Sequence, residues 1–303
     1  MTHATIDFST YITITIWFGC NNNCTLCMLS DLKSKLRPVG YQRFQEMLSD
    51  IRKEGRYQNL ILSGAEVTTF NKLQKYARYA ASLNYFKKIQ IQTNGRRLAD
   101  INYVKDLIEC GVNEFFVSIH GLRQTHDAIT RRTGSFEQTW TGLQNLTGFD
   151  VNVISNTVVT KKNFHNIVHL MRLLHGKKLG ETHLWNFFAM EKADTGNNLV
   201  QLNHVVTLFP KLRDIANGSN IPIVFKNFPE CLPAKPPLYI DSRLAETLIP
   251  EPYWRAFAQN QFGLCLYRNN GACKARHCWG LSSAYVGKYG YERHLLSPMD
   301  NDR

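Results

Sequence analysis

The sequence predicts an α/β fold, in which helices cover a parallel β-sheet. Segments rich in β-branched residues alternate with amphipathic segments over residues 1–218. Each strand-helix unit is roughly 30 residues long, the spacing expected when a helix connects two parallel strands. There are six such units, which is too few for a closed eight-stranded barrel, so the predicted sheet is open.

The six predicted strands and helices follow each other in regular alternation. The strands are predicted at residues 11–18, 59–62, 88–93, 115–119, 151–159 and 182–188, and the helices at 41–54, 70–84, 101–110, 135–147, 163–175 and 201–217. Gly55, Gly111 and Gly218 follow three of these helices, where a glycine commonly ends a helix. In sheets of this kind the chemistry lies at the carboxyl ends of the strands.

The alternation breaks at about residue 219. Seven of the ten prolines lie between residues 222 and 252, and four of the eight cysteines follow residue 230. We therefore expect two parts, a core of residues 1–218 and a smaller cysteine-rich C-terminal module of residues 219–303.

The composition is that of a globular protein, with 44% hydrophobic residues among 303. The N-terminus lacks the basic and apolar regions of a signal peptide. No apolar stretch approaches the length of about 18 residues that a membrane span requires. Eight cysteines without a secretion signal favour a reducing compartment and metal ligation over disulfides. We therefore expect a cytoplasmic protein with no membrane partner.

The net charge is +12, from 36 Lys and Arg and 24 Asp and Glu. An excess of this size favours anionic partners such as nucleic acid. The basic residues are scattered, however, and no run of them reaches five. A solvated surface explains most of them, so a nucleic-acid partner is an alternative and not the favoured interpretation.

Three cysteines, Cys20, Cys24 and Cys27, fall within eight residues directly after the first predicted strand. Three thiolates suit three irons of a [4Fe–4S] cluster and leave the fourth iron open to a small molecule. A zinc knuckle, a disulfide pair and three unrelated buried thiols are the alternatives. Zinc normally needs four protein ligands, and none follows at a finger-like distance. The polar residues between the cysteines argue against simple core thiols.

This Cys-x3-Cys-x2-Cys spacing resembles the signature of the radical SAM superfamily. The resemblance implies that the open iron binds S-adenosylmethionine (SAM), and that an electron from the cluster cleaves SAM to a 5′-deoxyadenosyl radical. It also implies an open, partial (β/α)6 TIM-like barrel, in agreement with the number of predicted strands. A flavodoxin- or ferredoxin-type reductant is then the expected electron donor.

Segments at the ends of later strands also resemble the family. Gly64, Ala65 and Glu66 resemble its Gly-Gly-Glu motif, whose backbone and acid contact the methionyl amino group. Alanine replaces the second glycine here, and Val67 stands where the family usually has proline. The resemblance implies further SAM contacts: Leu26 at the adenine, Asn94 at the ribose or methionyl group, Ser118 at the ribose, Arg131 or Arg132 at the carboxylate, and Asn156, Val158 and Leu184 flanking the adenine.

The C-terminal module contains a second set of cysteines, Cys231, Cys265, Cys273 and Cys278. It resembles the auxiliary-cluster region called a twitch domain, related to the SPASM domain, which implies a second [4Fe–4S] cluster. A zinc site is the alternative. In a third interpretation three cysteines hold the cluster, and Cys231 is a catalytic hydrogen-atom donor. Cys110, at the end of a predicted helix, is expected to be a core thiol.

Four further side chains could line a substrate pocket, because they lie at predicted strand ends or in the loops that follow: His120, His126, His183 and Trp185. Structural histidines are commoner than catalytic ones, so none of them is predicted to be catalytic.

The predicted activity is reductive cleavage of SAM followed by abstraction of a hydrogen atom from a substrate C–H bond. Oxidation is expected if all four C-terminal cysteines bind a cluster, and epimerisation if a spare thiol returns hydrogen.

The short segment before the first strand leaves no room for a leader-peptide domain, which favours a small polar natural product, such as an amino sugar, over a peptide. An RNA- or peptide-modifying radical SAM enzyme and a non-catalytic iron–sulfur or zinc scaffold are the alternatives.

Overall fold

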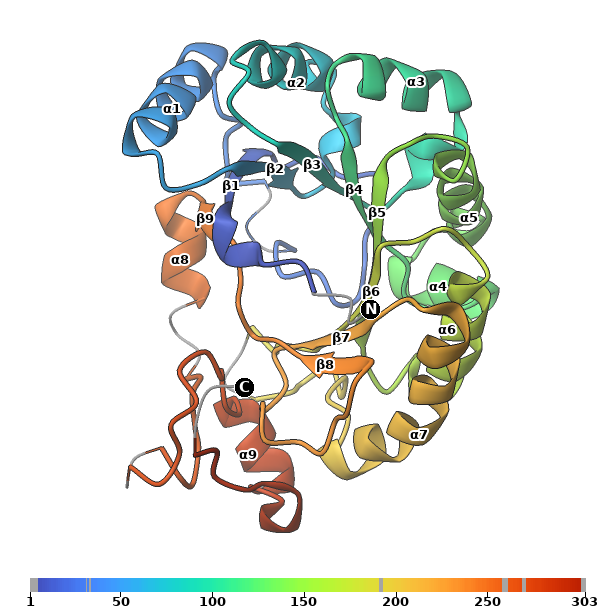
Figure 1. Cartoon of the computed structure of the whole chain (residues 1–303), viewed down its shortest axis with the longest axis vertical. Coiled ribbons are helices and arrows are strands. Elements are labelled where there is room, and N and C mark those ends of the chain that lie inside the picture. The colour runs from blue at the N-terminus through green and yellow to red at the C-terminus, as the bar shows by residue number, and fades with distance from the viewer. Residues whose placement is uncertain are drawn as a thin grey trace.

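The computed structural model describes residues 5–30, 32, 34–190, 193–257, 261–268 and 271–300. Within these residues, nine strands form one sheet in the order β8-β7-β6-β5-β4-β3-β2-β1-β9. Every pairing between neighbours is parallel. Figure 1 shows the strands curving around a central space with the helices outside them. The expected α/β fold with a partial barrel is therefore confirmed.

The strands are β1 (Tyr11–Trp17), β2 (Asn59–Gly64), β3 (Lys88–Thr93), β4 (Glu114–Ser118), β5 (Asn152–Val159), β6 (Glu181–Asn186), β7 (Ile223–Lys226), β8 (Leu238–Ile240) and β9 (Glu246–Leu248). The helices are α1 (Tyr41–Glu54), α2 (Leu73–Ser82), α3 (Ile101–Glu109), α4 (Arg123–Thr130), α5 (Ser135–Leu146), α6 (Ile167–His175), α7 (Leu202–Ser219), α8 (Glu251–Phe257) and α9 (Ser283–Tyr289). All six predicted strands are present, with ends shifted by at most two residues.

Strand β1 shows how the sequence builds the barrel. Its isoleucines, among them Ile12 and Ile14, are fully buried in the main hydrophobic core with Phe44 of α1. The threonines between them, Thr13 and Thr15, line the interior cavity of the barrel. Because successive side chains of a strand point to opposite faces, alternating isoleucine and threonine places an apolar face against the helices and a polar face inside.

The sheet extends past residue 218, where the sequence predicted the start of a separate module. Strands β7, β8 and β9 are only three or four residues long and lie among prolines, so they carry no periodicity that identifies them. Three of the four C-terminal cysteines follow β9, and Cys231 lies between β7 and β8. The division of the chain at residue 218 stays a prediction.

Strands β8 and β9 are consecutive in the chain but form opposite edges of the sheet. The connection of residues 241–245 reaches at most about 20 Å, so the sheet must curve until its edges approach each other. Asp241 fixes this connection: its carboxylate accepts from Lys226 Nζ at 3.1 Å and from Arg243 Nε at 3.0 Å. The side chain of Lys226 is 1% exposed. A buried ion pair therefore holds the connection against β7.

Helix α4 is absent from the sequence prediction, which passed directly from the fourth strand to the helix at 135–147. It is eight residues long and mostly polar in sequence, with only His126, Ile129 and Thr130 buried. A helix this short shows only about two turns of periodicity, so the pattern of apolar residues could not reveal it. Its importance lies in its last turn, which contacts the cysteine loop.

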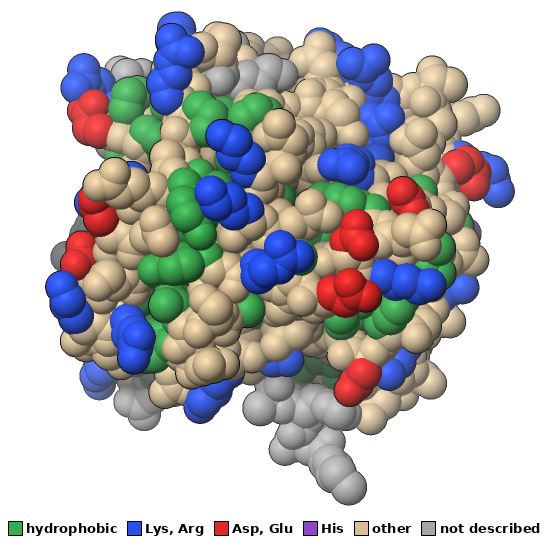
Figure 2. Space-filling view, turned by 90° about the horizontal axis from the view of Figure 1, so that it is seen from above, with side chains coloured by type: hydrophobic (Ala, Val, Ile, Leu, Met, Phe, Trp, Pro, Cys, Tyr) green, Lys and Arg blue, Asp and Glu red, His purple; other side chains and the backbone are tan. Residues whose placement is uncertain are grey.

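The distribution of basic side chains on the visible face agrees with the scattered positive charge of the sequence. Figure 2 shows Lys and Arg side chains dispersed over one face, among neutral side chains and a few acidic ones. They do not gather into a single patch on that face. No described helix combines the length and apolar character that crossing a membrane requires.

We predict that Gly64→Ala strongly destabilises the protein. Gly64 ends β2 with a φ of +152°, and a Cβ atom there would lie 1.9 Å from the carbonyl oxygen of Trp17 on β1. The two strands must separate to admit it, so the free energy of unfolding should fall by at least about 2 kcal/mol. Urea denaturation would measure this change.

Gly55→Ala is the matched control. Gly55 also has a positive φ, of +69°, but a Cβ atom added there would meet no other atom within 4 Å. Only the backbone strain remains, at about 1 kcal/mol. Equal losses of stability in the two variants would contradict the predicted clash between β1 and β2.

Candidate active site

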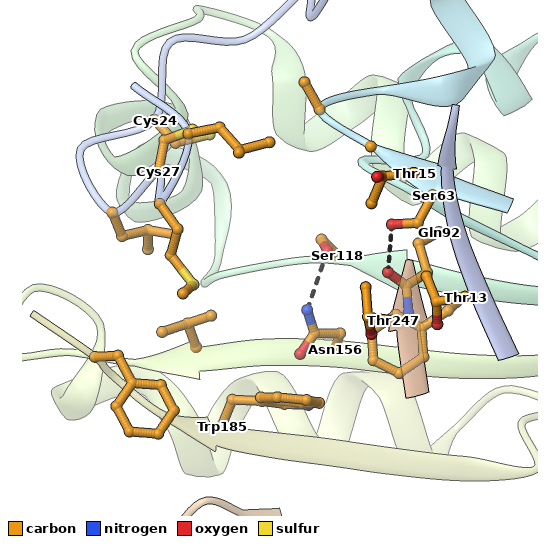
Figure 3. Close-up of a pocket in the computed structure, with 18 of the residues that line it drawn as sticks. Thr13, Thr15, Cys24, Cys27, Ser63, Gln92, Ser118, Asn156, Trp185 and Thr247 are labelled. Carbon is orange, nitrogen blue, oxygen red and sulfur yellow. Dashed lines mark hydrogen bonds between the residues drawn. The ribbon is translucent and has the colours of Figure 1, made fainter. Parts of the chain in front are cut away.

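A cavity of about 490 Å³ begins at the carboxyl ends of the strands and continues into the barrel. It contains residues from the loops after β1, β2, β3 and β4 and from the interior faces of most strands. Figure 3 shows its layout, with Cys24 and Cys27 at one end, Ser118 and Asn156 in the middle, and Thr13, Thr15, Ser63, Gln92 and Thr247 at the other end. The cavity thus joins the cysteine loop to the barrel interior.

The three thiols of Cys20, Cys24 and Cys27 all line this cavity. They are partly exposed and form no disulfide. The backbone N–H of Asn22 donates to Cys20 Sγ at 3.3 Å, a hydrogen bond that stabilises a thiolate ligand. Among the described residues, no three His, Cys, Asp or Glu side chains converge as ligands of a single metal ion would. Cluster ligands bind different irons and need not converge on one point, so the donor set fits a [4Fe–4S] cluster.

The end of α4 holds the cysteine loop from one side. The N–H of Asn23 donates to the carbonyl of Thr130 at 3.0 Å, and the N–H of Thr25 donates to the carbonyl of Ile129 at 2.8 Å. The last carbonyls of a helix lack partners within the helix. The loop therefore satisfies groups that α4 leaves free, and in return its backbone is fixed.

The loop after β3 holds the cysteine loop from the other side. Arg96 Nη1 donates to the carbonyl of Asn21 at 2.6 Å and to Asn22 Oδ1 at 2.8 Å. The amide of Asn94 donates to Asn21 Oδ1 at 2.7 Å. Sequence reasoning missed Arg96, because no motif marks it and its partners are distant in the chain. In the structure Asn94 fixes the loop as well as lining the cavity.

The turn after β2 forms part of the cavity wall. The N–H of Ala65 donates to the carbonyl of Trp17 at 2.9 Å, and the N–H of Glu66 donates to the carbonyl of Gly19 at 3.0 Å. Gly64 and Ala65 line the cavity. These bonds tie the Gly-Ala-Glu turn to the residues just before Cys20.

Glu66 itself is 1% exposed and is not among the residues that line the cavity. Its Oε1 accepts from the N–H and hydroxyl of Thr68, at 3.0 and 2.6 Å, and from the hydroxyl of Thr93 at 2.7 Å. Its Oε2 accepts from the N–H of Asn94 at 2.5 Å. Burial raises the pKa of this carboxyl, although the hydrogen bonds act in the opposite direction. The structure thus shows Glu66 positioning the loop after β3, and direct contact with SAM stays a prediction.

Five of the other expected SAM contacts line the cavity, namely Leu26, Asn94, Ser118, Asn156 and Val158. Asn156 Nδ2 donates to Ser118 Oγ at 3.1 Å across neighbouring strands (Figure 3). Leu184 does not line the cavity, because it is fully buried in the core on the other face of β6. The next residue, Trp185, faces the cavity in its place, as the two-residue period of a strand requires.

Arg131 and Arg132 also lie outside the cavity lining. Both are exposed, and Arg131 directly follows the last residue of α4 in the left-handed conformation, with a φ of +53°. The sequence suggested a loop directly after the fourth strand, but α4 carries these residues to the surface. The structure therefore does not support their expected contact with the SAM carboxylate. Within the described part of the chain, the cationic residues that line the cavity are Lys226 and Arg243.

Two of the four candidate pocket residues are a stacked pair of histidines. His120 and His126 both line the cavity, with ring centroids 6.1 Å apart. The N–H of His120 donates to His126 Nδ1 at 3.0 Å, and the N–H of Val158 donates to His120 Nδ1 at 3.3 Å. Burial lowers the pKa of His120 to about 3 and that of His126 to about 4. Both rings are thus neutral at pH 7 and carry their proton on Nε2.

His183 does not line the cavity. It is fully buried against the rings of Phe8 and Phe116, and its Nε2 is 2.7 Å from Glu181 Oε2. It is a structural histidine beneath the cavity.

The C-terminal cysteines meet around a second, small cavity, lined by Cys231, Cys265, Cys273 and Cys278. Backbone N–H groups donate to three of these sulfurs at 3.4–3.5 Å, those of Cys265, Cys273 and Cys278. Burial raises the pKa of Cys231 to about 11, and the neighbouring thiols act in the same direction. The four sulfurs and the backbone N–H groups that donate to them fit a cluster ligated by four thiolates. Cys110 is buried in the main core, as predicted.

Comparison with known proteins agrees with this site. Residues 14–174 match the radical SAM superfamily. The AdoMet-dependent heme synthase of Methanosarcina barkeri is 32% identical over 174 residues, which are 56% of this chain and 48% of that protein. A dimethyltransferase of 7,8-dihydro-6-hydroxymethylpterin from Methanocaldococcus jannaschii is 27% identical over 50% of this chain and 31% of its own length. The chain thus spans about half or less of the length of these relatives.

Solved structures share the fold. Streptococcus suis SuiB bound to its precursor peptide SuiA has a TM-score of 0.54 and 13% identity, and the alignment covers 95% of this chain and 62% of that one. The family match covers more than half of the chain and contains the cysteine loop, the Gly-Ala-Glu turn and the histidine pair. The chain therefore belongs to the radical SAM superfamily, whose members bind a [4Fe–4S] cluster and SAM.

Proposed function

We propose that the protein removes a hydrogen atom from a C–H bond of a substrate bound inside the barrel, and that the overall reaction is an oxidation. The single observation that carries this proposal is the continuous cavity from the cysteine loop to the barrel interior. A reactive radical must meet its substrate in an enclosed space, because water and other molecules would compete with the substrate. The barrel wall supplies that enclosure.

Cys20, Cys24 and Cys27 would hold the [4Fe–4S] cluster, and SAM bound beside it supplies a 5′-deoxyadenosyl radical on one-electron reduction. Ser118 and Asn156 lie between the cysteine loop and the far end of the cavity (Figure 3). This position supports a role for Ser118 in orienting the ribose by hydrogen bonds. The expected electron donor is a flavodoxin- or ferredoxin-type protein.

The position of Cys231 favours oxidation over epimerisation. Cys231 lines the second cavity with the other three cysteines, and it is not among the residues that line the first cavity. A hydrogen-atom donor would have to reach the substrate carbon, whereas a cluster ligand belongs with the other thiols. A cluster held by the four cysteines would accept the electron that a substrate radical gives up on oxidation.

A small polar molecule is the favoured substrate, and a peptide is the second candidate. The structure of SuiB was solved with a precursor peptide, and the likeness in fold extends over nearly the whole chain. The cavity nevertheless lies inside the barrel, and the cluster and SAM would occupy the part beside the cysteine loop. The remaining space favours a small molecule or one or two side chains of a peptide. On the face shown in Figure 2 the basic side chains are dispersed, so that face gives no support to an RNA substrate.

We predict that Cys20→Ala abolishes formation of 5′-deoxyadenosine from SAM under anaerobic reducing conditions. The variant lacks one of three ligands, so reconstituted protein should contain about four irons per chain where the wild type contains about eight. Iron analysis and chromatography of the products measure both effects. Cys110→Ala is the control, because that thiol lies in the core; it should retain both the iron and the activity. A Cys20→Ala variant that still cleaves SAM would contradict the assignment, as would a wild type that does not.

We further predict that Cys231→Ala loses about four irons per chain but keeps the SAM-dependent signal of the first cluster. Electron paramagnetic resonance of the reduced protein, with and without SAM, distinguishes the two clusters. If the variant keeps the full iron content and loses only solvent-hydrogen incorporation into a product, then Cys231 is the hydrogen donor and the proposed oxidation is wrong.

A further inference from the structure

The end of the main cavity away from Cys24 and Cys27 has an unusual composition. Five polar residues from four strands meet there: Thr13 and Thr15 of β1, Ser63 of β2, Gln92 of β3 and Thr247 of β9. Figure 3 shows their side chains gathered on one side of the cavity, opposite the cysteines. We call these five residues the hydroxyl wall. None of them belongs to the expected SAM contacts.

Three hydroxyls of this wall already donate their proton to a hydrogen bond within the protein. Thr15 donates to the carbonyl of Leu248 at 3.0 Å, and Thr247 donates to the carbonyl of Ala245 at 3.1 Å. Ser63 donates to Gln92 Oε1 at 2.7 Å. A hydroxyl has one proton and two lone pairs. Toward a ligand, these three oxygens therefore act only as hydrogen-bond acceptors.

Gln92 complements them with donors. Its Oε1 accepts from Ser63, so its amide NH₂ presents two N–H groups. The hydroxyl of Thr13 has no hydrogen-bond partner among the described residues and is free to donate or to accept. A ligand that satisfies the hydroxyl wall must thus offer several donors to the threonine and serine oxygens and an acceptor to Gln92.

The charge of the cavity restricts the ligand further. No Asp or Glu is found among the described residues that line it. The two cationic residues found among the described lining residues, Lys226 and Arg243, are both paired with Asp241. Arg243 Nη1 also lies 3.4 Å from Asp7 Oδ1. A buried ligand charge without a partner costs several kcal/mol. Among the described lining residues, an ammonium ion finds no carboxylate, and an anion finds only cations that are already neutralised.

Trp185 completes the site. Its indole ring borders the cavity next to Asn156 (Figure 3), and its Nε1–H is buried without a hydrogen-bond partner among the described residues. Asn156 Oδ1 is likewise buried and unpartnered. An aromatic face contacts C–H groups, whereas the two polar atoms add one donor and one acceptor. This combination suits a ring that carries both C–H groups and hydroxyls.

We propose that the hydroxyl wall binds a neutral, polyhydroxylated substrate, a sugar or cyclitol ring without an amine or an acid. The ring hydroxyls donate to Thr15, Ser63 and Thr247 and accept from Gln92, and the ring carbons rest on Trp185. This inference rests on the proposed function and narrows it, because it replaces the amino sugar expected from the sequence with a ring that has no amine. The carbon that loses hydrogen is one that faces back toward the cysteine loop.

Binding to the reconstituted, unreduced protein in the presence of SAM tests this inference. The probes are methyl β-D-glucopyranoside, methyl N-acetyl-β-D-glucosaminide and myo-inositol, each compared with its per-O-methyl ether, and N-acetyl-trialanine amide as a peptide. Isothermal titration or saturation-transfer NMR measures the affinities. At least one polyol should bind at least about tenfold more tightly than its ether, because the ether keeps the ring but loses every hydroxyl donor.

Three variants locate the contact. Thr15→Val and Thr247→Val should each weaken binding of that polyol by about five- to tenfold, since each removes one acceptor and keeps the shape of the side chain. Thr157→Val is the matched control: it makes the same change on β5, where the hydroxyl donates to the carbonyl of Ile119 outside the cavity. All three should keep the wild-type affinity for SAM, which separates loss of the wall from loss of the fold.

The inference is overturned if no polyol binds, if the ethers bind as tightly, if the peptide alone binds, or if Thr157→Val weakens binding as much as the wall variants do. Its failure is distinct from that of the proposed function. Protein that forms 5′-deoxyadenosine but binds none of the polyols contradicts only the substrate class. Protein that does not cleave SAM contradicts the proposed function itself.

Discussion

The site depends on the hydrogen bonds that hold an irregular loop in place. The described residues between β1 and α1 form no helix or strand, yet their three thiols must face one cavity. Carbonyls at the end of α4 hold the loop on one side and the guanidinium of Arg96 holds it on the other. An unrestrained loop would lose backbone entropy of about 1–2 kcal/mol per residue on ligation. Fixing the loop in advance means that cluster binding need not supply this free energy.

A second constraint comes from the short connection between β8 and β9. It joins the two edges of the sheet and so forces the barrel to curve around its interior. Asp241 anchors the connection through Lys226 and Arg243. Together with Asp7, which lies 3.4 Å from Arg243, the same carboxylate balances the charge of the two described cations that line the cavity. One buried ion pair therefore shapes the barrel and at the same time removes free charge from the space in which a substrate would bind.

The sequence predicted the features that rest on local patterns and missed those that rest on tertiary contacts. The isoleucine-threonine alternation of β1 and the three-cysteine spacing can each be recognised within ten residues. In the structure the isoleucines lie in the core, and the threonines and the cysteines line the cavity. Arg96 has no local signature, because its partners Asn21 and Asn22 are about 75 residues away. Leu184 was predicted to line the cavity, but its neighbour Trp185 does so. A shift of one residue along a strand exchanges the core face for the cavity face. The short strands after residue 218 are held by pairing with their neighbours and show no pattern of their own.

In the proposed reaction, selectivity would have to come from position, because a carbon radical attacks C–H bonds with little chemical discrimination. The structure offers fixed groups for this purpose. The pKa values of His120 and His126, about 3 and 4, keep both rings neutral at physiological pH, so the N–H of each Nε2 is a permanent donor. The acceptors of the hydroxyl wall are equally fixed, since their protons bind backbone carbonyls and Gln92. A site whose donors and acceptors cannot exchange roles orients a ligand in one way. That single orientation decides which C–H bond faces the cysteine loop.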